Sequence, residues 1–341
     1  MDDLARLRRD AETVWNAAIE AVRPERLVGR RLSCDAAGRL LVDGMPLDPP
    51  LSLDDCGRIV VVGGGKAAAG LAAGVEAVLG PERLARHDVA GLVSVPAGCE
   101  RSLPRIEVRA TRPATVNLPT PEVVRATGEM LEAVSACGPR DLVIALITGG
   151  GSALLAAPRP GVTLEEKIAL TRRLSESGAD ITSLNAARSE LSLVKGGGLA
   201  VACRAGRLLV LVLSDVIGDD LRVIASGPCL PRDERARDGR WTTPTGCLVQ
   251  HLLLGSNATA VAAAKAAAES AGYVVRSGSA ATATVAEAVG DELAAAGLEL
   301  VIEAECTDRP LAIIGGGEAT VTVPADHGTG GRNQQTVLSA I

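Results

Sequence analysis

Residues 142–155 read LVIALITGGGSALL, in which an unbroken aliphatic run leads directly into three glycines and a serine. A buried strand that ends in glycines leaves backbone N–H groups free with no Cβ beside them, so an anion can bind against the peptide. The stretch therefore predicts a phosphate-binding turn at the end of a central strand. Glycines also occur in tight turns and at close packing contacts. This motif alone therefore does not decide between a phosphate-binding and a purely structural role.

The same pattern recurs elsewhere in the chain. An aliphatic run followed by three glycines is found in IVVVGGGKAA (59–68) and LAIIGGGE (311–318), and a further glycine set stands in VKGGGL (194–199). In the first of these Lys66 follows the glycines, where it can extend toward a phosphoryl group. None of the sets fits the GxxxxGK[ST] phosphate loop or the GxGxxG dinucleotide fingerprint, so the common modes of nucleotide binding are not supported.

Composition narrows the class of protein. The 341 residues include no Phe, one Tyr and two Trp, and 47% are hydrophobic. A core of Ala, Val, Leu and Ile is typical of buried parallel strands covered by helices. Scarce aromatic residues and a net charge of −6 without a basic run argue against a nucleic-acid partner.

The amino-terminal residues, the apolar segments and the cysteines indicate the cellular compartment. No stretch has the length of uncharged apolar sequence that a membrane span needs, and the first ten residues are charged where a secretory signal would be apolar. Eight cysteines are scattered without a CxxC pair, and the three histidines are isolated. We therefore expect a cytoplasmic protein with reduced cysteines, no membrane partner, and neither a zinc site nor a Ser/His/Asp triad.

Periodicity predicts an α/β protein, because strands alternate with helices from residue 58 onward. A helix is expected over 2–22 and a hairpin over 39–44. The expected strands are 59–62, 90–95, 106–109, 142–148, 208–213, 252–254, 273–275, 312–314 and 319–323. A further helix is expected to begin at Ala67, and four others are expected over 121–135, 163–177, 258–271 and 282–296.

A charged, proline-bounded segment at 231–244 predicts a domain boundary. We expect a Rossmann-like parallel-sheet domain over 1–235 and a smaller α/β domain over 245–341. The second domain looks incomplete, because the chain stops at Ile341 inside a helix that begins near Asn333. We expect an exposed apolar face on that helix, with either aggregation or self-association through it, a homodimer being one such form, and weak or absent catalytic activity.

Six sequence blocks, in order, identify a resemblance to the glycerate 2-kinase family, also called type-II glycerate kinases, some of which carry the older name hydroxypyruvate reductase. The blocks are VVGGGKAA (61–68), LITGGGSALL (146–155), NAARSELSLVKGGGLA (185–200), VLSDVIGDDLRVIASGP (212–228), IIGGGEATVTV (313–323) and GTGGRNQQ (328–335). Residues 111–119 depart from the family's usual segment, and family members generally continue for most of another hundred residues.

The resemblance implies two α/β domains with the active site between them, and phosphorylation of glycerate at its 2-hydroxyl using ATP and Mg²⁺. A small hydroxy acid is then the substrate. Two alternatives stay open: a family member that binds nucleotide or an organic acid without turnover, and an oxidoreductase acting on hydroxypyruvate. The missing dinucleotide fingerprint weighs against the second alternative.

Three residues are candidates for catalysis. The resemblance places active-site residues at Lys66 and Arg332, and the guanidinium of Arg332 suits bidentate binding of a carboxylate or phosphate. Asp215 follows the aliphatic run 208–213, and carboxylates at the carboxyl edge of a parallel strand lie where such sheets bind ligands. It is the first candidate for a magnesium ligand or a hydroxyl-orienting base, whereas Asp219 and Asp220 more often stabilise the next turn.

The candidate cofactor-binding residues are mainly glycines and basic or polar side chains. Ser152 can contact phosphate or cap the following helix. Arg188 can bind an acidic substrate or pair with Glu190 on a helix surface. Glu318 can face the site or lie in solvent at a strand edge. The full binding set is Gly64, Gly65, Gly149, Gly150, Gly151, Ser152, Asn185, Arg188 and Lys195.

Overall fold

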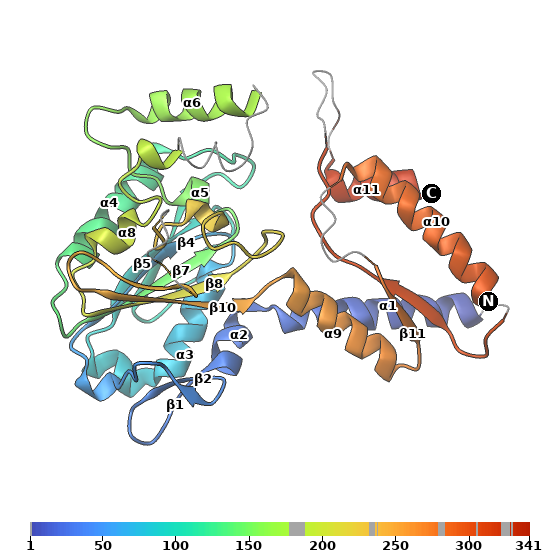
Figure 1. Ribbon diagram of the computed structural model, residues 1–341, viewed down its shortest axis with the longest axis horizontal. Coiled ribbons are helices and arrows are strands. Elements are labelled where there is room, and N and C mark those ends of the chain that lie inside the picture. Colours follow the sequence, from blue (N-terminus) through green and yellow to red (C-terminus); the bar gives the residue numbers. More distant parts are fainter. Residues whose placement is uncertain are drawn as a thin grey trace. The chain divides into compact units, whose positions relative to one another are not determined.

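The computed structural model describes residues 2–176, 188–231, 236, 238–278, 284–304, 306–321, 328 and 330–341 (Figure 1). The chain forms two compact units. One unit is Arg23–Leu254, and the other combines Met1–Val22 with Gly255–Ile341. This division differs from the limits 1–235 and 245–341 expected from sequence. The amino-terminal segment groups with the carboxyl-terminal one, and the first unit continues ten residues beyond the expected linker.

A seven-stranded sheet forms the centre of the larger unit, in the order β6-β5-β4-β7-β8-β10-β9. Strand β4 pairs in parallel with β5 and β7, β5 with β6, and β7 with β8. The strands are β4 (Ile59–Gly64), β5 (Ala90–Pro96), β6 (Ile106–Arg112), β7 (Leu142–Thr148), β8 (Arg207–Leu213), β9 (Arg240–Thr242) and β10 (Leu248–Gly255).

The five parallel strands, numbered along the chain, lie in the order 3-2-1-4-5, which is the Rossmann order. The direction of winding reverses between the first strand, β4, and the fourth, β7. Open α/β sheets bind ligands outside the carboxyl ends of the strands at such a reversal. Both the turn after β4 and the turn after β7 are glycine-rich, so the topology brings the two strongest sequence motifs together. The expected Rossmann-like fold is confirmed.

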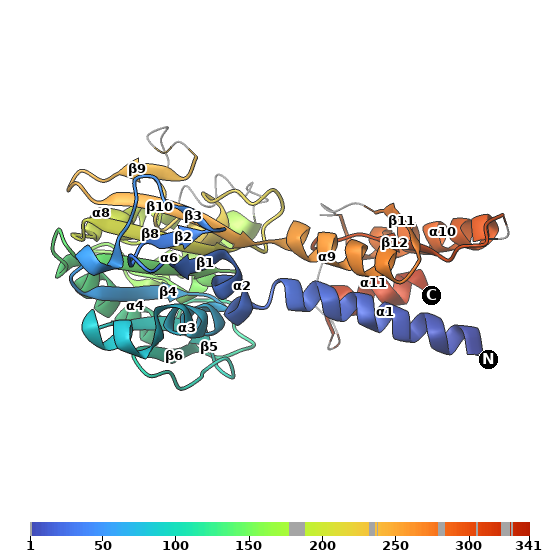
Figure 2. The ribbon, with the colours of Figure 1, turned by 90° about the horizontal axis from the view of Figure 1, so that it is seen from below.

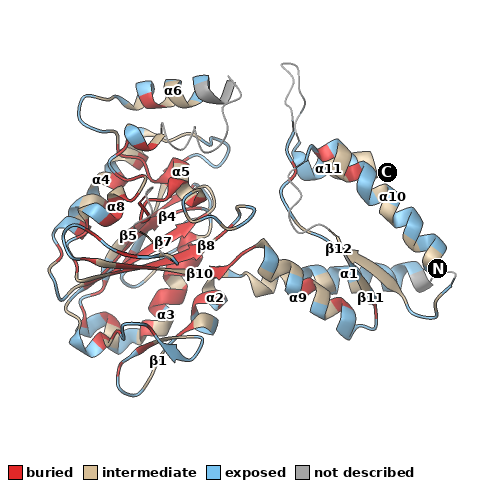
Figure 3. Ribbon diagram, viewed as in Figure 1, coloured by how far each residue is buried: buried red, intermediate tan, exposed pale blue. Residues whose placement is uncertain are grey.

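Helices on both faces explain why the central strands are aliphatic throughout. Every residue of β4 and of β7 is buried (Figure 3). On one face Val60 and Val62 pack in a cluster with Met130 and Leu199, whereas the α3 helix contacts β4, β5 and β7. The helices that the structure describes in this unit are α2 (Pro24–Arg31), α3 (Ala68–Arg86), α4 (Pro121–Ser135), α5 (Gly151–Leu154), α6 (Leu164–Glu176) and α8 (Gly198–Ala202), with short 3-10 turns η1 (Leu53–Asp55) and η2 (Ile224–Ser226).

A small antiparallel sheet precedes β4. It consists of β1 (Leu32–Cys34), β2 (Leu40–Val42) and β3 (Met45–Pro46). The turn between β2 and β3 has positive φ at both Asp43 and Gly44, as a two-residue hairpin of this hand requires. The hairpin expected over 39–44 is therefore confirmed.

The expected linker over 231–244 is wrong in its second half, because β9 adds an antiparallel edge strand to β10 there. Trp241 in β9 is buried and donates from its indole nitrogen to the backbone oxygen of Cys229 at 2.9 Å. Residues 232–235 and 237 lie outside the described part. Charged residues surround the single buried tryptophan in this segment. Its sequence therefore predicts a linker, and only the pairing with β10 shows that it is a strand.

The smaller unit has its own two-stranded parallel sheet, in which β11 (Val274–Ser277) pairs with β12 (Leu311–Ile314). Helix α1 (Asp2–Ala21) packs along α9 (Asn257–Ser270), as Figure 2 shows, and Tyr273 donates its hydroxyl to the carboxylate of Asp10 at 2.8 Å. This packing explains why residues 1–22 group with the carboxyl-terminal segment. Helix α10 (Ala286–Ala304) packs against α11 (Arg332–Ala340).

Two expected elements of the smaller unit differ from the structure. The helix predicted over 282–296 begins at Ala286 and continues to Ala304. The strand predicted over 319–323 is reduced, within the described residues, to one parallel bridge between Thr320 and Val285. Val337 and Leu338 on α11 are exposed, as predicted for that helix. No helix in the described ranges combines the length and apolar character needed to cross a membrane.

Candidate functional site

The two glycine-rich turns at the reversal of the sheet are joined directly by hydrogen bonds. The backbone N–H of Lys66 donates to the oxygen of Gly149 at 2.9 Å. The N–H of Ala67 donates to the hydroxyl oxygen of Thr148 at 3.1 Å, and Thr148 is 1% exposed. The residues that precede α3 are therefore hydrogen-bonded to the end of β7 and the turn after it.

Close approach of the backbone accounts for the glycines that flank this joint. A Cβ on Gly65 would lie 2.0 Å from Thr148 Oγ1, and one on Gly149 would lie 1.9 Å from Asp215 Oδ2. Close packing therefore explains Gly65, which also meets the backbone oxygen of Thr148 at 2.8 Å, whereas at Gly149 the close atoms belong to the exposed side chain of Asp215. Gly150 is different: its φ is +76°, and the nearest atoms to its missing Cβ are carbons of Lys66 at 3.5 Å and Arg112 Nη2 at 3.7 Å.

The side chains of two basic residues, Lys66 and Arg112, therefore lie beside Gly150. Lys66 is exposed and stands just before α3. Arg112 at the end of β6 is only 4% exposed, and it donates from Nη1 to the oxygens of Pro113 and Val116. Within the described residues its Nε has no partner, and burial lowers the pKa of Arg112. A buried guanidinium with an unused N–H beside an open glycine turn is suited to an anionic ligand.

Sequence reasoning did not select Arg112. It lies in residues 111–119, the segment that departs from the family pattern, so no motif marked it. Its position at the carboxyl end of a predicted strand was the available signal. Only the strand order shows that β6 ends on the same edge as the glycine turns.

Asp215 follows β8 on the same edge of the sheet. Its carboxylate lies against Gly149, and the residue is exposed. Asp220 accepts from the N–H of Arg222 at 2.8 Å and so stabilises the turn as expected, and Asp219 occupies a turn position with a positive φ. Among the residues that the structure describes, no three His, Cys, Asp or Glu side chains are grouped as a metal site. A single carboxylate is nevertheless compatible with Mg²⁺, which commonly binds one or two carboxylates together with substrate phosphate.

Ser152 and Lys195 lie together, although they are 43 residues apart. The ammonium nitrogen of Lys195 is 2.9 Å from the backbone oxygen of Ser152 and closer still to its hydroxyl. Ser226 completes the group, with its hydroxyl oxygen 3.0 Å from that of Ser152. Lys195 and Ser226 are buried, at 4% and 3% exposure, and Ser152 is half-buried.

Two further cations lie near Lys195. Burial, with the charges of Arg188 and Lys167, holds the pKa of Lys195 well below its usual range. Burial and Arg188 lower the pKa of Lys167 to about 8, and its Nζ has no partner within the described residues. Arg188 therefore lies near enough to influence Lys195, and its role in binding stays a prediction. Asn185 lies outside the described residues.

Arg332 belongs to the smaller unit, where its guanidinium lies 2.8 Å from the Glu318 carboxylate and donates to the oxygen of Ala319 at 3.2 Å. Glu318 is therefore an ion-pair partner of Arg332 rather than an isolated strand-edge residue. The catalytic role of Arg332 stays a prediction.

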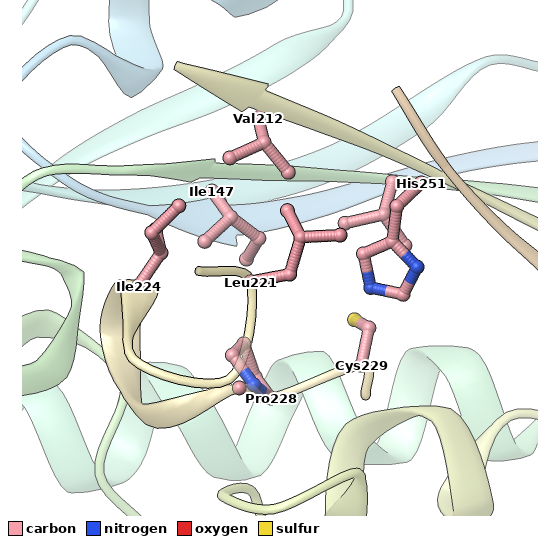
Figure 4. Close-up of a pocket in the computed structure, with 9 residues that line it drawn as sticks. Ile147, Val212, Leu221, Ile224, Pro228, Cys229 and His251 are labelled. Atoms are coloured by element: carbon pink, nitrogen blue, oxygen red, sulfur yellow. The ribbon is translucent and has the colours of Figure 1, made fainter. Parts of the chain in front are cut away.

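A separate apolar pocket lies at one face of the sheet (Figure 4). It is lined by Ile147, Val212, Leu221, Cys229 and His251, among others. His251 is its one imidazole; the ring contacts the oxygen of Gly239 at 2.7 Å, and burial lowers its pKa to about 4. A neutral histidine among aliphatic side chains indicates packing at this pocket.

Fold and site together define a Rossmann-order α/β protein whose sheet edge carries glycine turns, basic side chains and one carboxylate. Comparison with known proteins narrows this class. A family described as "Domain of unknown function (DUF4147)" matches residues 10–243.

Relatives named glycerate kinase include the human protein, 34% identical over 406 residues, covering 97% of this chain and 76% of the relative. The mouse protein is 40% identical over 243 residues, covering 68% of this chain, and the match spans 45% of that relative's length. A crystal structure of glycerate kinase from Thermotoga maritima is similar with a TM-score of 0.76 and 30% identity, over 98% of this chain and 80% of the other. The chain belongs to the type-II glycerate kinase family.

Proposed function

We propose that this chain is a glycerate 2-kinase, which transfers the γ-phosphoryl group of ATP to the 2-hydroxyl of D-glycerate with the help of Mg²⁺. One observation carries the proposal beyond family membership. Lys66, Arg112 and Asp215, from three different strand ends, converge on the turn around Gly149 and Gly150 at the reversal of the sheet.

Phosphoryl transfer depends mainly on positioning and on neutralising charge, with little covalent chemistry by the protein. In the proposed site Lys66 and Arg112 hold phosphate oxygens over Gly150, whose open turn admits them. Asp215 holds the divalent ion. Mg²⁺, when bound, neutralises charge on the phosphate oxygens.

The remaining selected residues have supporting roles in the proposal. Gly64, Gly65, Gly149 and Gly151 let the two turns approach, and Ser152, Asn185, Arg188 and Lys195 form the polar side of the acceptor site. Arg332 supplies a further cation for the carboxylate or phosphate of the substrates. A cytoplasmic location and a homodimer complete the proposal, and light scattering of the purified chain tests the dimer.

The test is a coupled assay of ADP formation with ATP, MgCl₂ and D-glycerate, comparing Lys66→Ala with the wild type. Loss of one preorganised charged donor should lower kcat about a hundredfold or more. Lys265→Ala is the matched control, because Lys265 is an exposed lysine on α9 whose charge faces Glu269 at 3.9 Å. Full activity of Lys66→Ala would refute the site, and absence of turnover in the wild type would refute the activity.

A reductase is the second candidate, because relatives from Agrobacterium vitis are named putative hydroxypyruvate reductase, one of them 34% identical over 308 residues. The chain lacks the GxGxxG fingerprint of dinucleotide folds. We therefore expect no oxidation of NADH by hydroxypyruvate, measured at the cofactor's absorbance in the same preparation.

A further inference from the structure

Three side chains from separate elements form a compact hydroxyl–amine cluster: Ser152 in α5, Lys195 before α8, and Ser226 in η2. The Lys195 nitrogen contacts the Ser152 hydroxyl, the two hydroxyls are 3.0 Å apart, and Lys195 Nζ is 3.4 Å from Ser226 Oγ. Kinase chemistry by positioning does not require such a cluster.

The surroundings of Lys195 disfavour its charged form. Lys167 on α6 and Arg188 are the neighbouring cations that lower its pKa, together with complete burial. Within the described residues Lys195 has hydrogen bonds only to the two serines. Burial beside two cations disfavours the ammonium form of Lys195 relative to the neutral amine, and no carboxylate among the described residues contacts its nitrogen.

The hydrogen bonds are fully compatible with a neutral amine. One N–H donates to the Ser152 backbone oxygen at 2.9 Å, and the second N–H points to the Ser226 hydroxyl at 3.4 Å. The third contact joins Lys195 Nζ to the Ser152 hydroxyl oxygen, and a neutral amine would use its lone pair there to accept the hydroxyl proton. A serine that donates to a neutral amine is an activated nucleophile.

The third member of the cluster, Ser226, lies in a strained backbone segment. Ala225, Ser226 and Gly227 have φ values of 51°, 63° and 58°, so two consecutive non-glycine residues occupy the left-handed region. Such a conformation is unfavourable and persists where the surrounding structure enforces it, commonly at functional sites. It places the Ser226 hydroxyl against that of Ser152.

We propose that Ser152 is a nucleophilic serine with Lys195 as its general base and Ser226 as a proton-sharing hydroxyl, and that it cleaves esters of small acids. Ser152 is the half-buried member of the cluster, whereas Lys195 and Ser226 are buried. Ser152 and Lys195 also belong to the proposed acceptor site of the kinase, but ester cleavage requires neither ATP nor Mg²⁺ and is measured without them.

The reaction proceeds in two balanced steps. Ser152 Oγ bonds to the acyl carbon while its proton moves to Lys195 Nζ, and the ester C–O bond breaks as the departing alkoxide takes that proton. Water then attacks the acyl-serine and gives a proton to Lys195. The bond from Ser152 Oγ to the acyl carbon breaks, Ser152 recovers the proton, and the free acid leaves.

The experiment uses the full chain, without ATP or glycerate, and a fluorophosphonate probe with p-nitrophenyl acetate as substrate. Peptide mass spectrometry of the wild type should place one phosphonyl group per chain on Ser152. Ser152→Ala should abolish labelling and reduce ester hydrolysis to the uncatalysed rate. Ser135→Ala is the matched control, because the Ser135 hydroxyl only donates to the backbone oxygen of Ala202 at 3.2 Å.

Two lysine variants separate a base from a structural support. Lys195→Arg keeps a hydrogen-bond donor but cannot lose its proton, and Lys195→Met removes the amine; both should slow labelling about a hundredfold or more. The wild-type labelling rate should also fall as Lys195 becomes protonated at lower pH. Unchanged labelling in either lysine variant, or wild-type protein labelled elsewhere or not at all, would overturn the proposal. The labelling site in the wild type tests the proposal even if a variant fails to fold. Neither probe labelling nor ester hydrolysis depends on kinase activity.

Discussion

Thr148→Val should destabilise the larger unit, because it removes the acceptor that joins the two glycine turns. Valine keeps the shape of threonine, so the change isolates the hydroxyl. The N–H of the half-buried Ala67 would lose its acceptor 3.1 Å away, the hydroxyl of Thr148, a side chain that is 1% exposed. Leaving a donor unsatisfied against such a buried side chain costs about 1–3 kcal/mol of unfolding free energy. For a unit of this size, a loss of about 2 kcal/mol lowers Tm by about 4–8 °C.

Tryptophan fluorescence during thermal unfolding measures this effect selectively. Trp241 is 4% exposed and lies in the larger unit, whereas Trp15 on α1 is 67% exposed and changes environment little. Thr148→Ser is the matched control, because it keeps the hydroxyl and loses one methyl group, at a cost of about 1 kcal/mol. The reasoning fails if Thr148→Val is as stable as the wild type, or if the serine variant loses as much stability as the valine variant.

Three other predictions concern charge. The folded pKa of His251 is about 4, below the unfolded value near 6.5, so its neutral form stabilises the fold above that unfolded value and the contribution is lost as pH falls toward 4. His251→Gln should therefore reduce the loss of unfolding free energy between pH 7 and pH 5 by about 2 kcal/mol in urea titrations, and an equal pH dependence in both proteins would contradict this. Glu76→Ala should cost about 1–3 kcal/mol, because the Glu76 carboxylate accepts the buried N–H of Ile106 at 2.8 Å; an unchanged urea midpoint would count against it. Asp215→Asn should raise the magnesium concentration for half-maximal kinase rate and leave metal-free thermal stability nearly unchanged, and an unaltered magnesium requirement would remove Asp215 from the metal site.

The sequence predicted the central α/β elements well, because their signals are local. Strand β7 and helix α4 have the limits expected from sequence, Leu142–Thr148 and Pro121–Ser135. An aliphatic run that ends in glycine, or a Thr-Pro start to an amphipathic stretch, specifies its own structure whatever surrounds it. The same kind of local pattern, an aliphatic run followed by glycine or a polar residue, correctly placed Lys66, Asp215 and the glycine turns next to strand ends.

Only the tertiary structure decided which strand ends meet, because strand order depends on packing between distant segments. It brought Arg112 to Gly150, Asp215 to Gly149 and Lys195 to Ser152, none of which a spacing in the chain encodes. It also grouped α1 with α9. Sequence patterns report how one segment buries its own surface, whereas a site is built from segments that bury one another, and that pairing is settled by the whole fold.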